Sequence, residues 1–160
     1  MINVGIIGSG FIVPVFIGCS RKCRDYHLRA IWGRHEEKLL QFKNDFDYCT
    51  TDLEAFLSDE KIDVVYVALP NALHYEYAMK ALKHGKHVIL EKPFTVFYKD
   101  AKKLIDLRSG DARRSTVSAS LIATREIGFL RLLVQSTTTK SAIEFRTARS
   151  DLTLVSSKEG

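Results

Sequence analysis

The chain has 160 residues, of which 46% are hydrophobic and 27% charged, and its formal net charge is +5. This length allows one well-cored domain but is too short for two full ones. The sequence has no apolar run near the roughly 20 residues of a membrane-spanning helix, and no basic face interleaved with base-reading residues. We therefore expect neither a membrane nor a nucleic acid as a partner. Because the N-terminus enters a strand pattern without a signal segment, a cytoplasmic location is predicted.

Strand-like and helix-like segments alternate over the first two thirds of the chain. Short apolar runs rich in β-branched residues predict strands at residues 2–7, 28–32, 63–69 and 87–90. Helices are predicted after the first strand, with Pro14 in the first turn, and at residues 35–45, 52–57, 72–84 and 98–107. Asp52 is expected to cap its helix, and Gly85 to end the next one. The alternation predicts an α/β fold of the Rossmann type, a doubly wound parallel sheet with right-handed crossovers.

The composition changes near Arg108. Residues 1–108 contain six Ser and Thr residues, whereas the 52 residues after them contain sixteen and have no Tyr, Trp, His, Pro or Cys. We interpret residues 1–108 as a Rossmann domain and residues 109–160 as an atypical Ser/Thr/Arg-rich tail, whose pattern favours neither helix nor strand. Our hypothesis is that the tail is the frame-shifted or otherwise disrupted remainder of a longer gene, so that the chain is truncated. Translation of the two other reading frames beyond codon 108 tests it.

The cysteines and histidines show no metal-binding pattern. The three cysteines, Cys19, Cys23 and Cys49, have no C-x-x-C spacing. They are expected to be reduced thiols rather than a disulfide framework or a zinc site. Outside His74, the spacing of the histidines also differs from that of metal ligands, so we expect no bound metal.

A glycine-rich turn follows the first strand, with the sequence Gly8-Ser9-Gly10 and then Phe11-Ile12-Val13. In a dinucleotide-binding fold the first glycine makes the tight turn and the second lets the backbone approach the pyrophosphate. The next helix then points its N–H groups at the phosphates. Here Val13 holds the third glycine position of the motif. The setting between a strand and a helix favours a dinucleotide site, and the alternative is a plain strand–turn–helix corner.

The second strand leads into Gly33, Arg34 and His35, and no carboxylate follows until Glu36. In this fold an acidic residue at that place binds the ribose 2′-hydroxyl of NAD, whereas an arginine accommodates the 2′-phosphate of NADP. Arg34 therefore favours NADP over NAD as the cofactor. The alternative is an arginine that is solvated in a loop.

Three later stretches carry further motifs, at residues 63–71, 74–81 and 85–93. The first ends in Leu69-Pro70-Asn71, the second begins at His74, and the third ends in Glu91-Lys92-Pro93. Together with the glycine turn, they resemble the N-terminal domain of the glucose–fructose oxidoreductase / inositol dehydrogenase family (Gfo/Idh/MocA). The resemblance implies an NAD(P)-dependent oxidoreductase that transfers a hydride between nicotinamide and a hydroxyl or carbonyl group of a small, sugar- or polyol-like substrate.

The resemblance also implies roles for individual residues. It places Lys92 beside the nicotinamide, where the lysine serves catalysis. His74 matches a histidine of the family, and for it both a catalytic role near the nicotinamide and a capping or packing role are open. Pro93 is often preceded by a cis peptide bond in the family. The residues implied to bind the cofactor are Gly8, Ser9, Gly10, Phe11, Ile12, Arg34, Leu69, Pro70, Asn71, Glu91 and Lys92.

The position of Lys92 agrees with this role on physical grounds. The lysine follows a buried strand at its carboxyl end, where ligands of open α/β sheets bind. An ammonium there can donate to, or orient, a substrate hydroxyl or carbonyl. Glu91 can hold that lysine or the nicotinamide ribose through a charge-assisted hydrogen bond. The alternative is a surface Glu–Lys pair in a turn.

Family members continue into a second α/β domain that supplies the substrate pocket, and nothing in residues 109–160 matches it. Without that domain, the sheet face that normally packs against it is exposed, which favours either self-association, with a homo-oligomer as one outcome, or instability. Besides the oxidoreductase interpretation, two alternatives stay open. One is a nonenzymatic dinucleotide-binding or regulatory module, and the other is an inactive truncated gene product.

Overall fold

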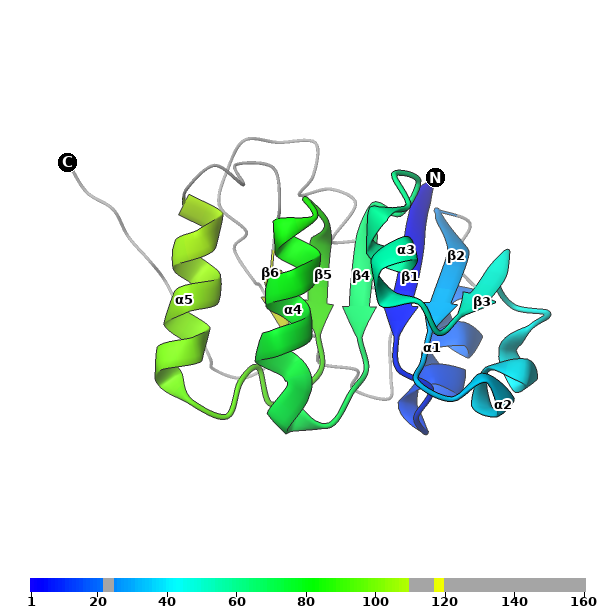
Figure 1. The fold of residues 1–160 in the computed structure, drawn as a ribbon, viewed down its shortest axis with the longest axis horizontal. Helices are drawn as coiled ribbons and strands as arrows, with labels where there is room; N and C mark the ends of the chain where they lie inside the picture. Colours follow the sequence, from blue (N-terminus) through cyan, green and yellow to red (C-terminus); the bar gives the residue numbers. More distant parts are fainter. Residues whose placement is uncertain (22–24, 110–116, 120–160) are drawn as a thin grey trace, which may run out of the picture. The chain divides into compact units, whose positions relative to one another are not determined.

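The computed structural model describes residues 1–21, 25–109 and 117–119. Within them the strands form one six-stranded sheet in the order β3-β2-β1-β4-β5-β6, and every neighbouring pair is parallel (Figure 1). The strands are β1 (Ile2–Ile7), β2 (Tyr26–Trp32), β3 (Tyr48–Thr50), β4 (Val64–Val67), β5 (His87–Leu90) and β6 (Val117–Ala119). The strand order reverses between β1 and β4, so the predicted doubly wound parallel sheet is confirmed.

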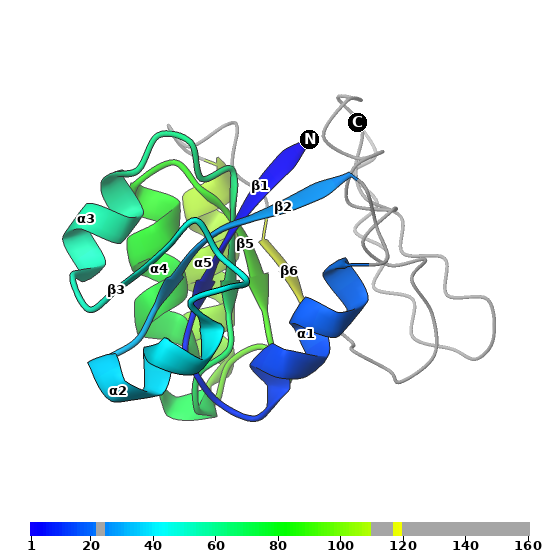
Figure 2. The same cartoon turned by 90° about the vertical axis from the view of Figure 1, so that its right-hand side faces the viewer.

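Helices cover both faces of this sheet. α1 (Ile12–Ser20) lies on one face, and α3 (Leu53–Ser58), α4 (His74–Lys83) and α5 (Tyr98–Ser109) lie on the other (Figure 2). The other helical segments of the described residues are the short α2 (Glu36–Leu39) and the 3-10 turns η1 (Leu40–Phe42) and η2 (Asn71–Leu73). Because the central strands are covered on both sides, β1 and β4 are nearly continuous apolar runs.

The centre of the sheet is completely buried. Ile6 and Ile7 of β1 expose no surface, and neither does Val67 of β4. Phe56 of α3 packs on β1 so closely that a Cβ at Gly5 would lie 2.6 Å from its ring. This core holds the carboxyl ends of β1 and β4 side by side, and the candidate site is built at that edge.

Two segments differ most from the sequence prediction, and the strand predicted at residues 63–69 is shorter, Val64–Val67. The helix expected at residues 35–45 is only α2 followed by the single turn η1, after which Asp45 N donates to Phe42 O at 2.9 Å. Asn44 and Asp45 favour a turn over continued helix. The prediction lacks β3, because this three-residue strand depends on its pairing with β2 rather than on a pattern of its own.

The sheet also continues beyond residue 108. β6 lies within the range predicted as a tail and pairs in parallel with β5. Apart from β6 and Ser109, the predicted tail lies outside the described residues.

Both predicted helix boundaries are confirmed. The Asp52 side chain caps α3, because its Oδ1 accepts 3.0 Å hydrogen bonds from the backbone N–H groups of Glu54 and Ala55. Gly85 follows α4 with a φ of +72°. This is the left-handed conformation that glycine adopts without strain, and it ends the helix.

Replacing Asp52 with alanine is expected to lower the free energy of unfolding by about 1 kcal/mol, because two N–H groups at the start of α3 lose their acceptor. Chemical denaturation of Asp52→Ala measures this loss. Asp52→Asn keeps a capping oxygen and should stay within about 0.5 kcal/mol of the parent chain. Equal losses in the two variants would exclude the cap as the cause.

Candidate active site

The glycine turn lies at the carboxyl edge of the sheet, directly after β1. Gly8 has a φ of +122°, and a Cβ at this position would lie 2.3 Å from the backbone oxygen of Ala68, the residue after β4. The Gly8 N–H donates a 2.8 Å hydrogen bond to the Trp32 carbonyl at the end of β2. The turn is therefore fitted between the ends of β2 and β4, where the strand order reverses and open α/β sheets bind their ligands.

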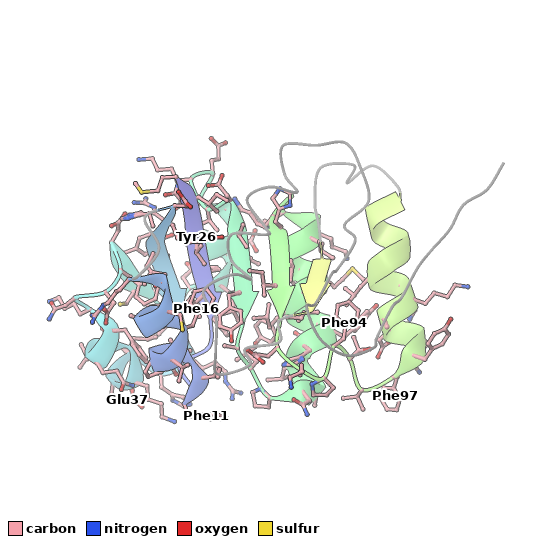
Figure 3. All side chains as sticks on the ribbon, turned by 180° about the vertical axis from the view of Figure 1, so that it is seen from behind. Phe11, Phe16, Tyr26, Glu37, Phe94 and Phe97 are labelled. Atoms are coloured by element: carbon pink, nitrogen blue, oxygen red, sulfur yellow. The ribbon has the colours of Figure 1, made fainter. Side chains whose placement is uncertain are left out.

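Gly10 differs from Gly8, because no packing contact requires it to be glycine. A Cβ at Gly10 would meet no atom of the described residues within 4 Å. Phe11, which precedes α1, has 91% of its surface exposed, whereas Phe16 of α1 is buried against the sheet (Figure 3). The open space beside Gly10 and the N–H groups of the first turn of α1 fit a closely approaching phosphate.

Arg34 lies on the loop next to this turn. Its neighbour Gly33 donates a 3.2 Å backbone hydrogen bond to the Thr50 carbonyl, and a Cβ on Gly33 would lie 3.5 Å from the Ser9 hydroxyl oxygen. The Arg34 side chain is exposed and has no ion pair among the described residues. The fold thus brings a guanidinium to the sheet edge that carries the glycine turn.

His74 connects the loops that follow β4 and β5. Its side chain is fully buried, with Nε2 2.8 Å from the Leu69 carbonyl oxygen and Nδ1 2.8 Å from the Pro93 carbonyl oxygen. Carbonyl oxygens only accept, so a ring nitrogen that carries a proton donates to the carbonyl that it faces. Pro70 and Asn71 are exposed beside this connection. The placement supports the packing alternative for His74, because both ring nitrogens are occupied by backbone.

The turn after β5 presents Glu91 and Lys92, and the peptide bond between Lys92 and Pro93 is cis. The Glu91 N–H donates to the Val67 carbonyl at the end of β4, at 3.3 Å. One Glu91 carboxylate oxygen accepts from the Lys92 backbone N–H at 3.1 Å, and the other accepts from the Tyr66 hydroxyl. The Lys92 side chain is exposed and takes part in no ion pair within the described part of the chain.

Three loops, after β1, β4 and β5, therefore meet at one sheet edge and carry the glycine turn, the Leu69 segment and the Glu91–Lys92 turn. Residues 2–118 match the model of the Gfo/Idh/MocA family, described as an oxidoreductase family with an NAD-binding Rossmann fold. The chain belongs to this family.

Two relatives show how much of a family member the chain covers. The scyllo-inositol 2-dehydrogenase (NADP⁺) IolU of Bacillus subtilis is 36% identical over 107 residues, which are 66% of this chain and 33% of that enzyme. An uncharacterized oxidoreductase of Schizosaccharomyces pombe is 49% identical over 113 residues, which are 66% of this chain and 30% of the relative. The chain thus spans about a third of the length of the curated relatives it matches.

Solved structures of oxidoreductases have a similar fold. KijD10, a 3-ketoreductase of Actinomadura kijaniata in complex with NADP and TDP-benzene, has a TM-score of 0.71 at 26% identity, over 86% of this chain and 42% of that one. A levoglucosan dehydrogenase in complex with NADH and L-sorbose has a TM-score of 0.64 at 28% identity, over 69% and 32% of the two chains. The predicted family and its NAD(P)-binding Rossmann domain are confirmed.

Tyr66 is a residue of this edge that the sequence analysis misses. It lies in β4, exposes no surface and stacks its ring on Phe16, with the ring centroids 4.4 Å apart. Burial, followed by the neighbouring Glu91 carboxylate, raises the pKa of its phenol above the ordinary value. The available signal was a tyrosine in a strand otherwise made of valines, because a buried hydroxyl needs a hydrogen-bond partner.

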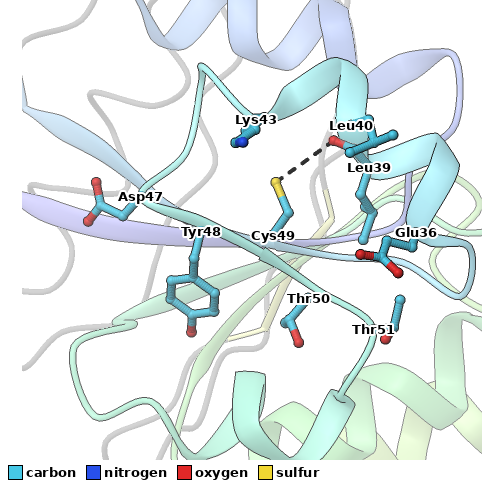
Figure 4. Close-up of a pocket in the computed structure, with 9 residues that line it drawn as sticks. All are labelled: Glu36, Leu39, Leu40, Lys43, Asp47, Tyr48, Cys49, Thr50 and Thr51. Carbon is cyan, nitrogen blue, oxygen red and sulfur yellow. Dashed lines mark hydrogen bonds between the residues drawn. The ribbon is translucent and has the colours of Figure 1, made fainter.

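A separate hollow of about 570 Å³ lies beside the edge strand β3 (Figure 4). Neither the glycine turn nor Lys92 lines it, so it is not part of the candidate site. Cys49 contributes its thiol, with Sγ 3.8 Å from the Leu39 carbonyl oxygen. Burial raises the pKa of this thiol, which disfavours the reactive thiolate. The lining residues are Glu36, Leu39, Leu40, Lys43, Asp47, Tyr48, Cys49, Thr50 and Thr51.

The remaining features of the sequence analysis concern metals, disulfides and membranes. Cys19 and Cys49 are free, and Cys23 lies outside the described residues. In residues 1–21, 25–109 and 117–119, no group of three or more His, Cys, Asp or Glu side chains is placed to hold a metal ion. No helix in the same ranges has the length and apolar character needed to cross a membrane.

Proposed function

We propose that this chain binds a nicotinamide dinucleotide and forms the cofactor-binding part of an oxidoreductase. The reaction is hydride transfer between that cofactor and a hydroxyl or carbonyl group of a sugar- or polyol-like substrate. The observation that carries the proposal is that two turns contact the carboxyl end of β4 and the residue that follows it. The Gly8 turn packs on Ala68, and the Glu91–Lys92 turn bonds to Val67. A turn suited to phosphates and a turn that bears a lysine thus share one sheet edge.

The residues at this edge divide into two groups. Those around the glycine turn would hold the pyrophosphate and the adenosine end, with Arg34 toward the 2′-phosphate of NADP. Those after β4 and β5 would line the nicotinamide end. NADP is the favoured cofactor, although solved family members are described with NADP or with NADH. The first group is Gly8, Ser9, Gly10, Phe11, Ile12 and Arg34, and the second is Leu69, Pro70, Asn71, Glu91 and Lys92.

Lys92 is the proposed catalytic residue. When bound, the cofactor accepts or supplies the hydride. The Lys92 ammonium donates a hydrogen bond to the substrate oxygen and stabilises the charge that develops there. Its exposure and its lack of an ion pair in the described structure support this role. His74, by contrast, is proposed to hold the Leu69 and Pro93 loops in place around the site.

Titration with NADPH and with NADH, followed by nicotinamide fluorescence, tests the cofactor site. The parent chain and Lys92→Ala are then assayed on a panel of sugars and polyols by the absorbance of reduced nicotinamide. We expect Lys92→Ala to keep most of its cofactor affinity, because Lys92 is only one of the residues proposed to bind it, and to lose about 10²-fold or more of any turnover, as for loss of a general acid or base. Failure of both cofactors to bind would refute the proposal. Binding without turnover in the parent would support a nonenzymatic dinucleotide-binding module.

Replacing Arg34 with alanine is expected to weaken NADPH binding about tenfold and to leave NADH binding nearly unchanged, because only NADPH carries a 2′-phosphate. Parallel fluorescence titrations measure both affinities. Arg21→Ala is the matched control, since Arg21 is also exposed but pairs with Asp45. Equal weakening of the two cofactors by Arg34→Ala would show that Arg34 does not select between them.

A further inference from the structure

The Glu91 carboxylate is hydrogen-bonded to other groups of the protein and not to the side-chain ammonium of Lys92, the next residue. Its Oε1 accepts a hydrogen bond from the Tyr66 hydroxyl, and its Oε2 accepts one from the Lys92 backbone N–H at 3.1 Å. Neither Glu91 nor the Lys92 ammonium forms an ion pair among the residues that the structure describes. Both carboxylate oxygens are thus engaged elsewhere, although opposite charges stand on adjacent residues.

Tyr66 is firmly placed for this contact. β4 lies inside the sheet between β1 and β5, and the Tyr66 ring is fully buried and stacked on Phe16 with an interplanar angle of 17°. Burial and the Glu91 charge raise the pKa of the phenol, so the hydroxyl keeps its proton and donates. The bond from Glu91 N to Val67 O ties the backbone of the same turn to the same strand. The Glu91 carboxylate therefore has a hydrogen-bond donor, the Tyr66 hydroxyl, whose position is set by β4.

We propose that Tyr66 is a positioning residue: by binding Glu91 it keeps this carboxylate off the Lys92 side chain, so that the Lys92 ammonium is free to meet the substrate oxygen. Without the hydroxyl, the Glu91 carboxylate would pair with the cation on the adjacent residue. That ion pair would compete with the substrate for the same N–H donors. The inference rests on the proposed function for the role of Lys92, whereas the contact between Tyr66 and Glu91 stands independently of it.

The reactivity of the Lys92 amine toward an acylating reagent tests this inference. The full 160-residue chain, without cofactor, is treated with limiting acetic anhydride at fixed pH, and acetylation of Lys92 is followed by peptide mass spectrometry. In Tyr66→Phe the Lys92 rate should fall about two- to fivefold, as expected when an exposed ion pair forms. In the double variant Tyr66→Phe/Glu91→Gln the rate should recover, because a neutral amide forms no ion pair. If Tyr66→Phe lowered the Lys92 rate only by disturbing the structure, adding Glu91→Gln would not restore that rate.

Tyr48→Phe is the matched control. Tyr48 also donates its hydroxyl to a carboxylate, Asp59 Oδ2 at 2.9 Å, but it lies in β3, which β2 and β1 separate from β4. Lys92 labelling should be unchanged in this variant. An unchanged Lys92 rate in folded Tyr66→Phe, or no recovery in the double variant, would overturn the proposal.

Glu91→Gln alone gives a second measurement that does not depend on the folding of Tyr66→Phe. An unchanged Lys92 rate supports the proposal, because Glu91 is then already held away from the lysine. A faster rate would show that Glu91 pairs with Lys92 in the parent chain, and the proposal would fail. Labelling needs no cofactor, so a negative NADPH titration would count against the proposed function without affecting these outcomes.

Discussion

Replacing Gly8 with alanine is expected to lower the free energy of unfolding by about 3 kcal/mol or more. Two effects add. A φ of +122° strains any L side chain, and the new Cβ would lie 2.3 Å from the Ala68 backbone oxygen. Ala68 cannot move aside freely, because its N–H donates a 2.9 Å hydrogen bond to the Ile7 carbonyl. Chemical denaturation followed by circular dichroism measures the loss.

Gly10→Ala is the matched variant in the same turn. Its Cβ would meet no atom of the described residues within 4 Å, so the unfolding free energy should stay within about 1 kcal/mol of the parent, the size of the chain-entropy effect of a Gly-to-Ala change without strain. NADPH affinity should nevertheless fall about tenfold or more, since the methyl group occupies space through which the pyrophosphate approaches the backbone. If Gly10→Ala bound NADPH as tightly as the parent, the turn would not cradle the cofactor. A Gly8→Ala variant of parent stability would contradict the packing argument.

The second large effect is expected at His74. His74→Leu should lower the free energy of unfolding by about 2–3 kcal/mol, because an apolar side chain of similar size removes the imidazole that lies between the Leu69 and Pro93 carbonyls and the hydrogen bonding that it provides there. The two loops lose their connection, so NADPH affinity should fall with stability. Denaturation and fluorescence titration of the same preparation measure both quantities.

His35→Leu is the control for this substitution. His35 is exposed, and its Nδ1 lies 3.6 Å from the nearest Glu37 oxygen, so its replacement should change stability by no more than about 0.5 kcal/mol. Loss of turnover in His74→Leu with parent stability and parent cofactor affinity would favour the catalytic alternative for His74. It would also show that the two carbonyl contacts contribute little.

Most of the fold follows from local patterns. The strands at residues 2–7 and 87–90 have the predicted bounds, because each is a short apolar run between polar or turn-forming residues. Asp52 and Gly85 set helix boundaries through their own side-chain and backbone chemistry. β3 is different, because Tyr48–Thr50 has no distinguishing pattern and is a strand only through its pairing with Ala30–Trp32 of β2.

By itself the sequence determined the parallel α/β sheet and the candidate residues of the glycine turn, Arg34 and Lys92, because alternation, spacing and order along the chain suffice for these. Only the tertiary structure decided that Gly8 is required by packing and Gly10 is not, and that the Glu91 carboxylate is bound by Tyr66. The reason is distance along the chain: Tyr66 and Glu91 are 25 positions apart, and His74 and Pro93 are 19 apart. Such partners meet only because the sheet places β4 and β5 side by side, and no local pattern encodes that meeting.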